Sequence, residues 1–192
     1  LYVVDVSNPS SPTLRGSYER PGSASDVVVS GNIAYVANEG GAFQIVDVSD
    51  PSSPTLRASF ATSGGGDVFV SGNLAYLADG NSGLRIVDVS NPASPQLRGS
   101  FDTPDNPQGA FVSGNLAYVA DGALEIIDVS NPSSPQPRGY YDGPYLGYVR
   151  DVFVSDKLAY AAVGQSLCVF DVSDPARPQR RGSCQTPYHA SS

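Results

Sequence analysis

The stretch LRIVDVSNPASPQLRGSF, residues 84–101, decides the fold because two strand patterns flank a proline-rich turn within it. Leu84–Val89 and Gln96–Phe101 are short runs rich in β-branched, aromatic and other apolar residues, as strands are. Asn91-Pro92 between them favours a turn, because proline keeps the preceding residue out of the helical region. The stretch therefore predicts a β-hairpin.

Related hairpins recur along the chain at a nearly constant interval. Successive copies of the aspartate in the DVS motif lie 42, 41, 40 and 43 residues apart. A period of this length is typical of repeat architectures. The repeated aspartates are Asp5, Asp47, Asp88, Asp128 and Asp171.

Two further strand patterns precede the hairpin within each full period. In the period quoted above they are Asp67–Val70 and Leu74–Ala78, separated by a Ser-Gly-Asn turn at 71–73. Four strands in about 40 residues, with no helical spacing between them, are the pattern of a β-propeller blade. The sequence therefore predicts an all-β fold, a β-propeller built of four-stranded antiparallel blades.

The pentapeptide that ends in each repeated aspartate resembles the repeat of a known family. It resembles the repeat of the LVIVD family, a bacterial and archaeal group whose members are expected to form propellers. The resemblance covers nearly the whole chain and implies a propeller and an association with the cell surface, with little about activity. The matching segments are LYVVD (1–5), FQIVD (43–47), LRIVD (84–88), LEIID (124–128) and LCVFD (167–171).

The order of the strand patterns divides the chain into a half blade and four complete blades. The half blade covers residues 1–18, and residues 185–192 correspond to a linker that leads to a missing blade. Because propellers close into rings that protect their edge strands, we expect a fragment of a propeller of about six to eight blades. Its open edges are expected to associate with one another. The complete blades are expected at 25–60, 66–101, 109–141 and 150–184.

The five repeated aspartates are interpreted as structural residues of the hairpin loops. An aspartate at such a turn accepts backbone N–H groups of the residues that follow it. A ligand-binding carboxylate is the alternative for the same residues.

The two cysteines, Cys168 and Cys184, flank the last hairpin loop. Counted from the centre of the loop they face each other across the two strands, where a disulfide can form. The sequence thus predicts a Cys168–Cys184 disulfide, with two reduced thiols as the alternative. The disulfide would place the protein in an oxidising compartment: extracellular, periplasmic or on the cell surface.

Composition and charge exclude several functional classes. The net charge of −8 and a single lysine, Lys157, argue against nucleic acid as a partner. No apolar run is long enough for a membrane span. The only histidine is His189, so the chain offers no catalytic triad, metal site or cofactor site, and we predict no catalytic residues.

Three carboxylates are expected near the mouth of the central channel. Asp26, Asp67 and Asp151 open the innermost strand of three blades, and Gly109 takes this position in the fourth. They could hold a cation or a basic group. Alternatively each carboxylate accepts hydrogen bonds from a neighbouring loop and joins blade to blade.

The connections between blades, and those between the second and third strands of a blade, differ in length and residues, whereas the hairpin loops hardly differ. Variable loops on a repeated scaffold are where such folds place recognition. The connection at 142–149 is the richest in side chains that anchor interfaces. Its candidate residues for binding a partner are Tyr145, Leu146, Tyr148 and the adjoining Arg150, and the alternative is that these rings pack on a further blade.

The sequence predicts a non-enzymatic binding or scaffolding propeller of an extracellular or cell-envelope protein. A protein or a glycan is the expected partner, recognised through the variable loops. Two alternatives stay open: an accessory part of an enzyme whose catalytic residues lie elsewhere, and a cation-binding module that uses Asp26, Asp67 and Asp151.

Overall fold

The computed structural model describes residues 1–19, 22–143 and 147–187. These residues form one two-stranded sheet and four four-stranded sheets, all antiparallel, and every sheet follows the order of the chain. The predicted all-β architecture of four-stranded blades is confirmed. No helix in this part of the chain is long and apolar enough to cross a bilayer.

The half blade contains β1 (Tyr2–Asp5) and β2 (Thr13–Ser17). Blade 1 contains β3 (Ala24–Ser30), β4 (Ile33–Asn38), β5 (Ala42–Asp47) and β6 (Thr55–Ala61). Blade 2 contains β7 (Val68–Ser71), β8 (Leu74–Ala78), the short 3₁₀ turn η1 (Gly80–Ser82), β9 (Leu84–Asp88) and β10 (Gln96–Phe101). Blade 3 contains β11 (Gly109–Ser113), β12 (Leu116–Ala120), β13 (Leu124–Asp128) and β14 (Gln136–Tyr141). Blade 4 contains β15 (Val149–Ser155), β16 (Leu158–Val163), β17 (Ser166–Asp171) and β18 (Gln179–Gln185).

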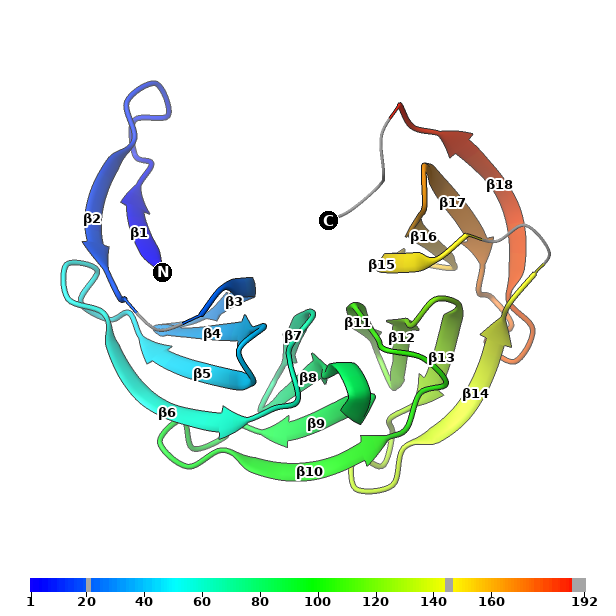
Figure 1. Cartoon of the computed structure of the whole chain (residues 1–192), viewed down its shortest axis with the longest axis horizontal. Coiled ribbons are helices and arrows are strands. Elements are labelled where there is room, and N and C mark those ends of the chain that lie inside the picture. The colour runs from blue at the N-terminus through cyan, green and yellow to red at the C-terminus, as the bar shows by residue number, and fades with distance from the viewer. Residues whose placement is uncertain (20–21, 144–146, 188–192) are drawn as a thin grey trace.

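The blades stand side by side along an open arc (Figure 1). The first strand of each full blade, β3, β7, β11 or β15, lies on the inner side of the arc. The fourth strand, β6, β10, β14 or β18, lies on the outer side, and the sheets do not close into a ring. One rim therefore carries the connections between blades and the turns between second and third strands, and the other carries the hairpin loops.

The hydrophobic core lies between the blades. One apolar cluster fills each interface, so the second and third strands of blades 1, 2 and 3 are buried on both faces. In β9, for example, Ile86 packs toward blade 3 and Val87 toward blade 1. Burial on both faces makes each blade depend on its neighbours, as expected for a repeat protein.

Every outer hairpin contains a β-bulge at an arginine of the fourth strand. The bulge residue has no partner in the ladder, so the pairing shifts by one position. In blades 1 and 4 the guanidinium of the bulge residue binds the repeated aspartate, in the pairs Arg57–Asp47 and Arg181–Asp171. The bulge residues are Arg15, Arg57, Arg98, Arg138 and Arg181.

The bulge makes the predicted disulfide wrong. Cys184 lies opposite Leu167, and Cys168 lies opposite Ser183. Because residues opposite each other point to the same face, the two thiols point to opposite faces of blade 4, and both cysteines are free. Counting outward from the loop misses the extra residue, Arg181, on one strand only.

A glycine that follows the bulge brings successive blades into close contact. A Cβ atom at Gly139 would lie 1.9 Å from the carbonyl oxygen of Pro175, in the hairpin loop of blade 4. The equivalent Gly16 and Gly99 face the hairpin loops of the next blades in the same way. Gly182, in blade 4, has no atom within 4 Å of its would-be Cβ.

We predict that Gly139→Val lowers the free energy of unfolding by about 2 kcal/mol, because the side chain displaces the loop of the next blade. Gly182→Val is the matched control and should change it by less than about 0.5 kcal/mol. Urea unfolding followed by circular dichroism measures both, and equal losses in the two variants would contradict the close contact.

Candidate functional site

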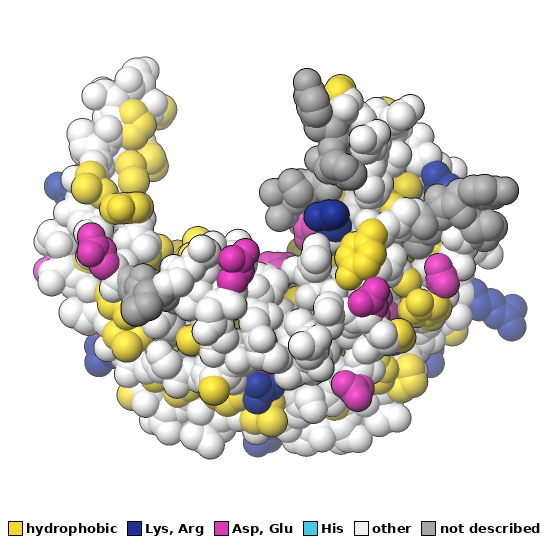
Figure 2. All heavy atoms as spheres, viewed as in Figure 1, with side chains coloured by type: hydrophobic (Ala, Val, Ile, Leu, Met, Phe, Trp, Pro, Cys, Tyr) yellow, Lys and Arg dark blue, Asp and Glu magenta, His cyan; other side chains and the backbone are white. Residues whose placement is uncertain are grey.

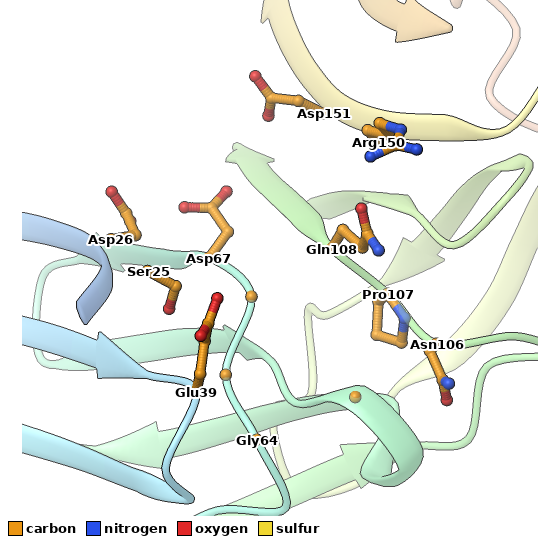
Figure 3. A pocket seen from close by; sticks show the side chains of 13 residues that line it. Ser25, Asp26, Glu39, Gly64, Asp67, Asn106, Pro107, Gln108, Arg150 and Asp151 are labelled. Carbon is orange, nitrogen blue, oxygen red and sulfur yellow. The ribbon is translucent and has the colours of Figure 1, made fainter. Parts of the chain in front are cut away.

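Two of the pockets on the rim that carries the connections between blades contain site residues predicted from the sequence. The first, the channel-mouth pocket, has a volume of about 530 Å³ and lies between the inner strands of the blades (Figure 3). It brings together the three predicted carboxylates and adds one more acid and one base. Its charged residues are Asp26, Glu39, Asp67, Arg150 and Asp151.

Two of these carboxylates join successive blades. Asp26 accepts a hydrogen bond from the backbone N–H of Val68 at 3.0 Å, and Asp67 accepts one from the backbone N–H of Ala110 at 3.0 Å. Each donor is the first or second residue of the next blade's inner strand. This is the geometry expected if the carboxylates join one blade to the next by hydrogen bonds.

The next interface is built differently because Gly109 carries no carboxylate. A Cβ atom at Gly109 would lie 2.8 Å from the Cα atom of Asp151, so β11 and β15 approach too closely for a side chain. The backbone N–H of Val152 is bound instead by the neighbouring Asp151, at 2.8 Å. The glycine therefore replaces a bonded junction by a tighter backbone contact.

Asp67 is held largely in its neutral form. Burial, a hydrogen bond with the Asp26 carboxyl group and the charges of Asp26 and Asp151 raise its pKa from 3.8 to about 8, against the lowering effect of the Ala110 N–H. Figure 3 shows Asp26 and Asp67 side by side at the mouth of the channel. The raised pKa of Asp67 lowers the negative charge at the place where a cation was the alternative.

The cation alternative gains no support from the geometry of the carboxylates. Across residues 1–19, 22–143 and 147–187, no three His, Cys, Asp or Glu side chains are placed to hold a metal ion together. In the channel-mouth pocket, Arg150 also supplies a positive charge of its own.

The five repeated aspartates all lie in the outer hairpins, on the opposite rim. In each, one carboxylate oxygen accepts the backbone N–H of the serine two residues later, at 2.8–3.0 Å. Hydrogen bonds from this serine lower the pKa of all five carboxyl groups, that of Asp47 to about 2. These contacts order the start of each loop and leave the aspartates a structural role.

The loop at 142–149 divides its candidate residues between the pockets. Tyr145 and Leu146 lie outside the described residues. Arg150 lines the channel-mouth pocket, whereas Tyr148 lines the second pocket and donates a hydrogen bond to the carbonyl oxygen of Asn106 at 3.2 Å. Of the two candidates within the described residues, Tyr148 and Arg150 therefore line different pockets.

The second pocket, the tyrosine pocket, has a volume of about 410 Å³ and spans the junction of blades 3 and 4. Gly122 and Val149 form a two-way backbone bridge across this junction, with N···O distances of 3.2 and 3.1 Å. Gly122 has a φ of +91°, and a Cβ there would lie 3.2 Å from both the Tyr148 ring and the Asp105 carboxylate. The tyrosine and acidic side chains that line the pocket are Asp105, Asp121, Tyr140, Asp142 and Tyr148.

Two buried acidic residues of blade 3, Asp121 and Glu125, were not predicted from the sequence. Asp121 and Glu125 are 2% and 6% exposed, and each has one buried carboxylate oxygen, Oδ2 or Oε2, without a hydrogen-bond partner in the described structure. Burial raises the pKa of both carboxyl groups, and with the charge of Asp121 it raises that of Glu125 to about 7. Alignment of the repeats could have identified these acids, because Glu125 takes the position at which blade 2 has the oppositely charged Arg85.

We predict that Asp67→Asn stabilises the protein by about 2 kcal/mol above pH 8. The native state holds a proton that the unfolded chain releases near pH 4, so wild-type stability falls as the pH rises from about 4 to about 8. Asparagine keeps an acceptor for the Ala110 N–H and a donor for Asp26, without the charge.

Urea unfolding at several pH values measures this effect. At pH 5, where wild-type Asp67 is neutral, Asp67→Ala also removes the acceptor and should be destabilising by about 1 kcal/mol or more. An asparagine variant that keeps the wild-type dependence on pH would contradict the raised pKa of Asp67.

Comparisons with known proteins support the fold. The computationally designed Ika8 protein superposes with a TM-score of 0.68 at 14% identity, over 89% of this chain and 52% of Ika8. A functionally unknown protein from Desulfotomaculum acetoxidans DSM 771 gives a TM-score of 0.72 at 14% identity, over 98% and 66%. This chain thus spans about half to two thirds of the length of these two structures.

A search of curated proteins finds no match to this chain. A family model, that of the LVIVD repeat, matches the sequence five times, at residues 1–20, 21–62, 65–103, 108–143 and 146–186. Each match contains one of the hairpins described above. The chain therefore belongs to the LVIVD repeat family.

Proposed function

We propose that the protein is a binding module without catalytic activity, which recognises its partner through the rim that carries the connections between blades. The observation that carries this proposal is the position of the two pockets. Both open on this rim, and both are lined by the segments in which the blades differ from one another.

The opposite rim has the character of scaffold. Its hairpin loops repeat nearly the same residues in each blade, and their aspartates are engaged by the backbone of the loop. Variation concentrated on one rim of a repeated scaffold is the usual sign of a recognition surface.

The charge of the molecule favours a partner with basic groups. The net charge is −8, and acidic side chains lie over the face seen in Figure 2, with most visible basic ones toward its outer edge. A protein or a decorated glycan with positive groups fits this surface. The proposed location at the cell surface rests on the family resemblance, since the free cysteines remove the argument from an oxidising compartment.

Arrays of glycans and of basic peptides, probed with the labelled full chain, test this proposal. Any ligand found is then measured against Arg150→Ala, in the channel-mouth pocket, and Tyr148→Ala, in the tyrosine pocket. We expect one of them to weaken binding at least tenfold, which is about 1.4 kcal/mol.

The matched control is Lys157→Ala, in a turn of the opposite rim, which should change the affinity less than twofold. Binding that Lys157→Ala abolishes, while both pocket variants retain it, would place recognition on the other rim and contradict the proposal.

A further inference from the structure

Blade 2 contains a buried cation site that the chain fills with its own side chain. The guanidinium of Arg85, in β9, lies 3.1 Å from Oδ2 of the fully buried Asp79 and 2.9 Å from the carbonyl oxygen of Ala61. It also lies over the ring of Phe60 in the preceding blade, 4.6 Å from the ring centroid. A carboxylate, a carbonyl and an aromatic face together satisfy one positive group.

Other blades also have compatible residues at these two positions. Blade 1 has two uncharged amides, Asn38 and Gln44, of which Gln44 has a buried oxygen without a partner in the described structure. Blade 4 has two apolar residues, Val163 and Cys168. The position therefore varies from blade to blade, but in these blades the two residues match in polarity.

Blade 3 breaks this rule. Asp121 takes the place of Asp79, but Glu125 takes the place of Arg85, so two buried carboxyl groups adjoin with no cation between them. Phe101 stands at the position of Phe60, so the aromatic residue of the site is retained in the sequence. Buried acids without a counter-charge are costly, and the unpartnered oxygens mark the missing partner.

The surroundings of Asp121 and Glu125 also differ from those in the other blades, because two tyrosines lie there. Tyr140 lies opposite Glu125 in the β13–β14 ladder, where the equivalent residues of the other full blades are Ser59, Ser100 and Ser183. Tyr148 comes from the following connection and lines the same pocket. Two tyrosines beside carboxylates are the chemistry that receives organic cations.

We propose that the tyrosine pocket binds a guanidinium group from outside the chain, with Asp121, which lines the pocket, and Glu125, which adjoins Asp121 and Tyr140, as its anionic partners. The proposal rests on the proposed function and names the ligand class of one of its two pockets. The source of the group is an arginine side chain of a partner or a small guanidinium compound, and the chemistry is the same for both. Blade 2 is the internal precedent, since there a guanidinium completes the equivalent site.

The proposal implies a dependence on pH. Glu125 is largely protonated below its raised pKa of about 7, so binding weakens as the pH falls from 8 to 6. Asp105 and Asp121 keep the pocket negatively charged at higher pH. The positive charge of Arg150 partly offsets them near Tyr148. Two charged groups, Glu125 and Arg150, act on the pocket electrostatically without lining it. The titratable groups that line it are Asp105, Asp121, Tyr140, Asp142 and Tyr148.

Calorimetric titration of the full chain with three acetylated tripeptide amides tests the proposal. The peptides are Gly-Arg-Gly, Gly-Lys-Gly and Gly-citrulline-Gly, and citrulline keeps the shape of arginine without its charge. At pH 8 we expect the arginine peptide to bind at least tenfold more tightly than the citrulline peptide. Methylguanidinium, titrated in parallel, separates the sources: equal affinity indicates a small compound, and tighter peptide binding indicates an arginine of a partner.

Variants of blade 3 locate the binding. Glu125→Arg, alone and with Tyr140→Ser, rebuilds the arrangement of blade 2 and should abolish peptide binding while raising the melting temperature. Glu125→Gln should weaken binding at least tenfold. The control Asp156→Asn removes one carboxylate from the exposed turn between β15 and β16, on the opposite rim, and should leave the affinity within twofold.

Three results would overturn the proposal. They are equal binding of the arginine and citrulline peptides, unchanged binding in the Glu125→Arg/Tyr140→Ser variant, and a heat of binding for Ca²⁺ but none for the arginine peptide. The proposed function is tested separately, since a ligand from the arrays that depends on Arg150 or Tyr148 supports rim recognition even if no guanidinium binds.

Discussion

Every full blade with a neighbour on each side buries both faces of its sheet, and the rest of the structure depends on this two-sided burial. A side chain in the second or third strand has no route to solvent on either face, so its polar atoms need partners within the protein or a ligand. The apolar clusters between blades meet this demand with Val, Ile, Leu, Phe and Ala. The buried polar residues Asn38, Asp79 and Asp121 lie at or directly after the end of a second strand, where the rim begins.

The same constraint makes the repeats informative about function. Positions that lie in equivalent surroundings can be compared within one chain, and a departure stands out when its compensation is missing. Gly109 is a compensated departure, because Asp151 binds the N–H that an aspartate of the preceding blade would otherwise bind. Glu125 is an uncompensated one, because it adjoins Asp121 at the position where Arg85 binds Asp79 in blade 2.

Local chemistry explains which predictions succeeded. Alternating apolar residues and turn-forming dipeptides act over a few residues, and these predicted the strands and their order. The facing of residues across a hairpin is not local in this sense, because one bulge at Arg181 moved Cys184 away from Cys168. The rim was similarly hard to predict: Tyr148 and Arg150 are two residues apart, yet they line different pockets. Asp121 and Glu125 belonged to strand patterns and were treated as ordinary strand residues, although aligning Glu125 with Arg85 would have drawn attention to them.

The backbone bridge between Gly122 and Val149 gives the tyrosine pocket a mechanical character. Its two hydrogen bonds cross the seam between blades 3 and 4, and the pocket takes its walls from both sides of that seam. A ligand bound there would favour the present angle between blades 3 and 4. By linkage, a force that changes this angle would lower the affinity of the pocket for the ligand.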